Sequence, residues 1–176
     1  KGRDMTRIVA PTVDDIQRVG RAVGEHAMPG DLVMLNGPNG AGKTTMTQGI
    51  ADGLDVSDQV SSPTFVIAHI HPGRFDLVHV DAYRLESMDE LDALDLDASL
   101  EDSLTVVEWG AGKVESLTGS RLEIDIERPV GGDVDLEAED LGGEEPRILT
   151  LRPEGARAEA LAQVVISAVT DLVELA

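Results

Sequence analysis

The chain has 176 residues, which is enough for one sizeable hydrophobic core and short for two, so we predict a single domain over 1–176. Its formal net charge of −20 argues against a protein that holds nucleic acid through its own lysines and arginines. No apolar run reaches the length of a membrane span, and the absence of cysteine excludes a disulfide framework.

Composition also bears on the surroundings of the protein. The lack of cysteine and of an apolar signal segment suits a cytoplasmic location, with no membrane partner. Residues 1–4 are charged or polar, and we interpret them as a vector remnant before a native start at Met5. The acidity is explained either by solubility in a salty cell or by a partner with a basic surface. We favour the first explanation, because surface charge varies easily.

The first half of the chain alternates strands and helices. Thr12 is a residue of N-cap type, and the apolar residues after it recur at helical spacing and predict one buried helical face. A turn at 29–31 then precedes a continuous apolar strand of the kind buried on both faces. The predicted elements are a strand over 6–11, a helix after Thr12, a strand over Leu32–Asn36 and a helix over about 43–54.

The second half is predicted to hold a hairpin and three further strands. Two strands, 64–71 and 75–81, flank the turn residues 72–73 and indicate an antiparallel edge. The segment 129–146 is rich in Gly, Asp and Glu, and we interpret it as a long, exposed acidic loop. The remaining predicted elements are a helix over 87–95, strands over 104–108, Arg121–Glu127 and 147–151, and a closing helix over 154–175. This order predicts an α/β protein with a mostly parallel sheet, some antiparallel strands and flanking helices.

A glycine-rich loop lies between the buried strand and the second helix. The residues Gly37-Pro38-Asn39-Gly40-Ala41-Gly42-Lys43-Thr44 form a complete Walker A loop, followed by Thr45. Its glycines let backbone N–H groups turn inward around phosphates, and the helix that follows presents its positive end. Lys43 is expected to reach the β- and γ-phosphates and Thr44 to hold Mg²⁺. The chain is therefore predicted to have a P-loop NTPase-like fold and to bind a nucleotide with Mg²⁺.

Phosphoryl chemistry also needs an acidic group near the metal ion. Two predicted strands end in carboxylates, Asp81 and Glu108, and strand ends of this kind line the ligand crevice of open α/β sheets. A helix cap or a solvated strand end would explain each of them separately. Thr64, in a Ser-Pro-Thr segment, suits a switch residue that responds to the γ-phosphate, or an ordinary turn.

The histidines and the tryptophan allow further interpretations. His69 and His71 alternate onto one face of a strand, with His79 across the hairpin, so the three histidines are candidate ligands of a metal site. We favour ordinary strand histidines on an exposed face, because no cysteine joins them. Trp109 directly follows Glu108, and it suits the nucleotide pocket, a partner surface or the core equally.

Four motifs in this order and spacing resemble the bacterial TsaE (YjeE) ATPase family. They are Gly-x-x-Gly-Ala-Gly-Lys-Thr-Thr at 37–45, Ser-Pro-Thr-Phe at 62–65, His-x-Asp-x-Tyr-Arg-Leu at 79–85 and Glu-Trp at 108–109. The resemblance implies an ATPase needed to make threonylcarbamoyladenosine in tRNA, acting with the TsaB and TsaD subunits. In that family the other subunits transfer the threonylcarbamoyl group and tRNA contact is indirect.

The resemblance also implies roles for single residues. Lys43 and Thr44 would bind phosphates and Mg²⁺, Glu108 would be a metal ligand, and Asp81 would organise the metal-bound water or the nucleophile. Tyr83 and Arg84 match the motif and are assigned a structural or partner-facing role.

The loop departs from the family at one point. The family usually has Asp-Leu at the position of Pro38-Asn39, where this chain resembles ABC-transporter ATPases, although it lacks their Leu-Ser-Gly-Gly-Gln signature. Two alternative functions remain at this point. One is a small-molecule kinase, for which Arg74 and Arg84 are the arginines available as a lid; the other is a switch module that binds nucleotide without significant turnover.

Overall fold

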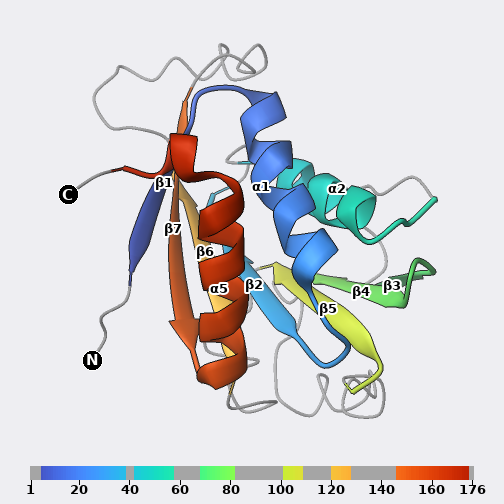
Figure 1. The fold of residues 1–176 in the computed structure, drawn as a ribbon. Helices are drawn as coiled ribbons and strands as arrows, with labels where there is room; N and C mark the ends of the chain where they lie inside the picture. The colour runs from blue at the N-terminus through green and yellow to red at the C-terminus, as the bar shows by residue number, and fades with distance from the viewer. Residues whose placement is uncertain are drawn as a thin grey trace.

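The computed structural model describes residues 5–38, 42–57, 68–81, 101–108, 120–127 and 146–174. Its strands form one seven-stranded sheet in the order β1-β7-β6-β2-β5-β4-β3 (Figure 1). The strands are β1 (Thr6–Ala10), β2 (Leu32–Asn36), β3 (Ala68–His71), β4 (Asp76–Asp81), β5 (Ser103–Glu108), β6 (Arg121–Glu127) and β7 (Arg147–Glu154).

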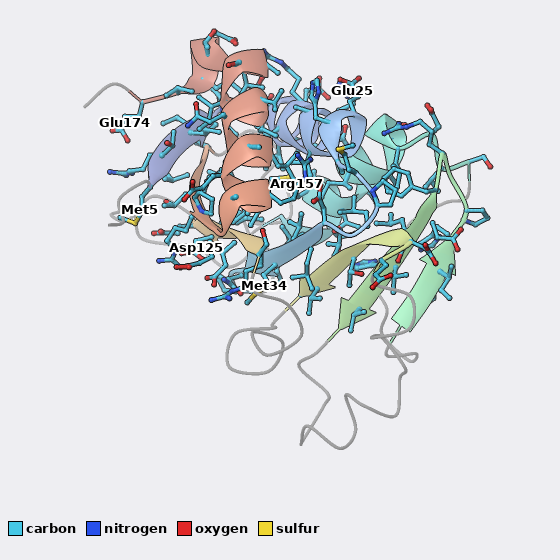
Figure 2. All side chains as sticks on the ribbon, turned by 60° about the horizontal axis from the view of Figure 1, so that its bottom comes forward. Met5, Glu25, Met34, Asp125, Arg157 and Glu174 are labelled. Carbon is cyan, nitrogen blue, oxygen red and sulfur yellow. The ribbon has the colours of Figure 1, made fainter. Side chains whose placement is uncertain are left out.

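Three described α-helices form a layer on one face of this sheet (Figure 1). They are α1 (Val13–His26), α2 (Lys43–Gly53) and α5 (Ala156–Ala168), and a 3-10 turn, η4 (Thr170–Leu172), follows α5. The main core lies between this layer and the sheet. Met34 and Asp125 lie on the opposite face, as Figure 2 shows. No helix in the described part of the chain is long and apolar enough to cross a membrane.

The centre of the sheet is parallel and its flanks are antiparallel. β2 pairs in parallel with β5 and β6, and β4 pairs in parallel with β5. β7 runs antiparallel to β1 and β6, and β3 forms the antiparallel hairpin with β4. The predicted α/β class with both kinds of pairing is confirmed, although antiparallel pairs are as numerous as parallel ones among the described strands. The parallel centre brings the carboxyl ends of β2, β4 and β5 to one edge.

The first helix forms as its local sequence predicts. Thr12 is the N-cap, and its hydroxyl accepts a hydrogen bond from the Asp15 backbone N–H at 3.3 Å. Asp14 and Asp15 lie in the first turn, where negative charge is favourable. The residues that recur at helical spacing, Ile16 and Val19 among them, are buried against the core.

The two last elements differ from their predicted bounds. β7 continues through Pro153. Among the described strands, β7 pairs at that residue with β6 and no longer with β1, so a missing N–H is tolerated there. The predicted closing helix over 154–175 is wrong at its end. The helix stops at Val169, whose φ of −129° is not helical, and Val173 then bridges to Ile8 on the edge strand β1.

Four glycines form the crossing between α1 and α2. Gly20 and Gly24 of α1 face Gly49 and Gly53 of α2, and all four are buried. A Cβ on Gly24 would lie 2.9 Å from Leu54 N and 3.0 Å from Gly53 C, which are both backbone atoms. Main chain therefore packs directly on main chain, which holds α2 tightly on α1.

Two arginines anchor the elements on either side of the glycine-rich loop, each at the end of the element that is far from the loop. Arg74, in the β3–β4 turn, donates to Gly53 O and Gly24 O at 3.0 Å each, so it caps the carboxyl ends of both α2 and α1. Arg157, at the start of α5, makes a bidentate pair at 2.9 and 3.1 Å with Asp31, which lies just before β2. The strand and the helix that flank the loop are thus both anchored at their far ends.

Several predictions fall outside the described residues. These are the vector remnant at 1–4, the helix over 87–95, the part of the acidic loop before Pro146, and the residues Asn39, Gly40, Ala41, Thr64, Tyr83, Arg84 and Trp109. They stay predictions.

Candidate functional site

The glycine-rich loop starts at the end of a buried central strand. Asn36, the last residue of β2, donates through Nδ2 to Asp125 Oδ1 of β6 at 3.0 Å, which fixes the strand end laterally. Gly42 precedes α2 with φ of +121°, a backbone conformation that residues with a Cβ rarely adopt. The end of β2, Gly42 and the N-terminus of α2 are therefore placed as the two flanks of a Walker A loop require.

Lys43 is the first residue of α2 and is buried. Its Nζ donates to Gly37 O at 2.5 Å and to Pro38 O at 3.1 Å, and so ties the start of the loop to the start of the helix. Thr47 Oγ1 donates to Lys43 O at 2.9 Å one turn further on. The ammonium is thus held beside the helix N-terminus, where anionic groups are favoured. Thr44 and Thr45 are half-buried in the same first turn.

Both predicted acidic strand ends lie at the same edge of the sheet as this loop. Glu108 ends β5, opposite Leu35 of the neighbouring β2, and Asp81 ends β4, opposite Glu108. Glu108 is 4% exposed although it is a carboxylate. Sequence reasoning placed these two residues at strand ends, and the register adds that their strands are direct neighbours.

A contact that sequence reasoning missed joins two of these strands. His79 Nε2 lies 2.7 Å from Glu108 Oε2, and the His79 side chain is completely buried. His79 lies two residues before the end of β4, and successive side chains alternate between the two faces of a strand. That alternation was the available signal, but it needed the pairing of β4 with β5 before Glu108 could be identified as the partner.

The histidines were expected on an exposed face, and this expectation is wrong for two of them. His71 and His79 are both buried, and His69 lies opposite His79 and stacks on His71 with ring centroids 5.9 Å apart. Within the described residues, no group of three or more His, Cys, Asp or Glu side chains is arranged to hold a metal ion. His71 and His79 are therefore buried polar side chains of β3 and β4, and the short contact to Glu108 distinguishes His79 from His71.

Arg74 does not serve as a lid over phosphates. It binds the carboxyl ends of α1 and α2, and the 11 residues of α2 separate it from the loop by about 16 Å.

A hollow of about 450 Å³ lies between β1, β7 and α5, away from the loop. Glu159 is the only charged residue among those lining it, and a carboxylate would repel phosphate. This hollow therefore does not suit a phosphate.

The residues at the loop edge suit a magnesium-bound nucleotide. A lysine ammonium and a helix N-terminus favour phosphate oxygens, and a hydroxyl with nearby carboxylates gives the hard oxygen donors that Mg²⁺ prefers. Thr44 at the start of α2 and Glu108 at the end of β5 are residues of these two types at this edge, and β4 ends beside Glu108 in Asp81. A magnesium ion held by such residues would neutralise negative charge on the phosphates.

A parallel sheet centre, a glycine-led helix that starts with lysine and acidic neighbouring strand ends together define a P-loop NTPase-like fold. Comparisons with known proteins agree with this class and narrow it. The family model described as "Threonylcarbamoyl adenosine biosynthesis protein TsaE" matches residues 10–132. The chain belongs to the TsaE family.

Individual relatives give the same result. The chain is 55% identical over 124 residues to the tRNA threonylcarbamoyladenosine biosynthesis protein TsaE of Streptomyces coelicolor, covering 68% of this chain and 84% of the relative. It is 34% identical over 152 residues to the protein of the same name from Bacillus subtilis, covering 85% and 87%. The crystal structure of Bacillus subtilis YdiB superposes with a TM-score of 0.72 at 28% identity, covering 93% of this chain and 95% of that one.

Proposed function

We propose that this protein is the Mg²⁺-dependent ATPase subunit that supports threonylcarbamoyladenosine synthesis in tRNA, acting in the cytoplasm with TsaB and TsaD. The observation that carries the proposal is the Lys43 ammonium, which binds Gly37 O directly after β2, together with the buried Glu108 at the end of β5, the strand paired with β2. Membership of the TsaE family supports the pathway, because relatives carry that name.

Each side chain has a definite task in this proposal. Lys43 binds the β- and γ-phosphate oxygens, while the N–H groups at the start of α2 face the same anion. The Thr44 hydroxyl and the Glu108 carboxylate hold the metal ion. Asp81 orients the metal-bound or attacking water, and Thr64 responds to the γ-phosphate. Indirect contact with tRNA agrees with the net charge of −20.

Calorimetry with ATP and Mg²⁺ tests the site. Lys43→Ala should abolish tight binding, and Glu108→Gln should weaken Mg²⁺-dependent binding more than Glu101→Gln does. Glu101 is the matched control, because it is an exposed glutamate just before β5. Unchanged affinity in Lys43→Ala would remove the loop from the site, and equal effects of the two glutamate variants would remove Glu108.

Phosphate release tests the reaction and its alternatives. The purified protein is assayed alone and with TsaB and TsaD. A low rate that rises with these subunits supports the proposal. Tight binding without turnover in either sample would favour the switch module, and turnover only with an added phosphate acceptor would favour the kinase.

A further inference from the structure

The strongest unassigned feature is the buried pair of His79 and Glu108. Their side chains come from neighbouring parallel strands and meet with 2.7 Å between Nε2 and Oε2. Their exposed fractions are 0% and 4%. A contact this short and this well shielded from water fixes the orientation of both groups far better than a surface pair does.

The surroundings of the imidazole indicate which atom carries the proton. His79 Nδ1 is buried and has no hydrogen-bond partner. A buried N–H without a partner is more costly than a lone pair without one, because carbonyl and other acceptor sites more often stay unpaired. We therefore assign the proton to Nε2, which then donates to Glu108 Oε2. The second carboxylate oxygen, Oε1, takes no part in this contact.

The second oxygen is left for a ligand. In the described part of the chain, Glu108 Oε1 makes no hydrogen bond or ion pair, whereas Oε2 is engaged by His79. Glu108 ends β5 beside β2, the strand that leads into the glycine-rich loop. An arrangement in which one carboxylate oxygen is fixed and the other is available is typical of metal-binding carboxylates, which are themselves hydrogen-bonded by neighbouring residues.

We propose that His79 is a positioning residue that holds the Glu108 carboxylate in the orientation needed to bind Mg²⁺. The inference rests on the proposed function, since that function makes Glu108 a metal ligand. His79 itself contacts neither the ion nor the nucleotide in this scheme. Loss of such an outer partner typically lowers metal affinity 10- to 100-fold, and we expect a decrease of this size here.

Two amide substitutions separate positioning from packing. The Nε2 of glutamine occupies nearly the place of imidazole Nε2 and can still donate to Glu108. The shorter asparagine places its amide near imidazole Nδ1 and cannot reach. His79→Gln and His79→Asn are therefore both polar and smaller than His, and they differ in reach. His71→Gln is the matched control, because His71 is also a buried strand histidine and is paired in register with Leu77.

The readout is the ratio of ADP dissociation constants measured by calorimetry with EDTA and with Mg²⁺. We expect this ratio to fall 10- to 100-fold in His79→Asn, to stay within a few-fold of the unsubstituted protein in His79→Gln, and not to change in His71→Gln. ADP affinity in EDTA should stay the same in all of them, because the loop is intact. Thermal unfolding of each variant checks the fold.

The outcomes distinguish this inference from the proposed function. If the unsubstituted protein binds ADP equally well with EDTA and Mg²⁺, the metal role of Glu108 fails, and the inference fails with it. If the unsubstituted protein binds ADP more tightly with Mg²⁺ and His79→Asn shows the same gain from Mg²⁺, the positioning role of His79 is overturned and the proposed function stands. The positioning role is also overturned if His79→Gln and His79→Asn lose the gain in ADP affinity from Mg²⁺ equally, because a purely structural histidine would behave in that way.

Discussion

The glycine crossing of α1 and α2 makes Gly24→Ala a demanding test of the packing. The added Cβ would lie 2.9 Å from Leu54 N and 3.0 Å from Gly53 C, and closer still to Ile50 O. Non-bonded heavy atoms pack at about 3.5 to 4.0 Å, so the closest of these contacts, to Ile50 O, requires α2 to retreat by more than about 1 Å. These are backbone atoms of a helix, so no side-chain rotation relieves the contact.

The magnitude follows from two opposing effects. Overpacking of a tight core typically costs about 1 to 3 kcal/mol, and the rigid backbone contact places this site at about 3 kcal/mol. Alanine regains about 1 kcal/mol of helix propensity relative to glycine. We expect a net decrease of about 2 kcal/mol in the free energy of unfolding. For a chain of this size, that decrease lowers Tm by about 4 to 8 °C.

Calorimetric and urea unfolding of the full chain measure this change. Glu25→Ala is the control, because Glu25 is exposed in the same turn of α1 and its backbone carbonyl is unaffected by the substitution. The double variant Gly24→Ala/Gly53→Ala should lose less than the sum of the single losses, since one retreat of α2 relieves both contacts. A Gly24→Ala protein as stable as the unsubstituted one would refute the reasoning.

Three further predictions concern other parts of the molecule. Arg74→Met should lower the free energy of unfolding by about 1 to 2 kcal/mol in urea, because the carbonyls of Gly53 and Gly24 lose a charged donor; an unchanged urea midpoint would contradict the capping role. Saturating Mg²⁺-ADP at about 100 times its dissociation constant should raise Tm by about 5 to 10 °C in the unsubstituted protein and leave Lys43→Ala unchanged; an equal rise in both would place the ligand elsewhere. The pKa of Asp171 lies below its ordinary value because Arg18 donates two hydrogen bonds to it, so its stabilisation is present above the unfolded pKa and is lost as pH falls through the lower folded pKa. As the pH falls below about 4, Asp171→Asn should therefore lose less stability than the unsubstituted protein, as measured by urea unfolding. Identical pH profiles of the two proteins would exclude this contribution of Asp171.

Local patterns were sufficient where an element is specified by its own residues. The N-cap Thr12 and the apolar spacing after it predicted α1, and the apolar run at Leu32–Asn36 predicted β2 to the residue. The glycine-rich loop could be placed for the same reason. Gly42 needs a positive φ and Lys43 needs a helix N-terminus, and both requirements are local.

Features that depend on distant residues could not be predicted from the sequence. The end of the closing helix depends on an open edge of β1, since Val173 pairs there with Ile8. From the sequence, Arg74 was a candidate lid residue of a kinase, because nothing near it in the chain shows that α1 and α2 end beside the hairpin turn. The partner of His79 likewise depends on the pairing of β4 with β5.

The glycine crossing has a consequence for how mutational data on this protein are interpreted. Positions 20, 24, 49 and 53 leave no space for a side chain, because backbone of the opposite helix occupies it. In a saturation screen scored on cell growth, these positions would be as intolerant as Lys43. Such a screen would therefore outline two helical stripes, four residues apart within each, that resemble a binding surface. A parallel screen scored on protein abundance would separate them, since Lys43 variants would still accumulate and variants at the glycine stripes would not.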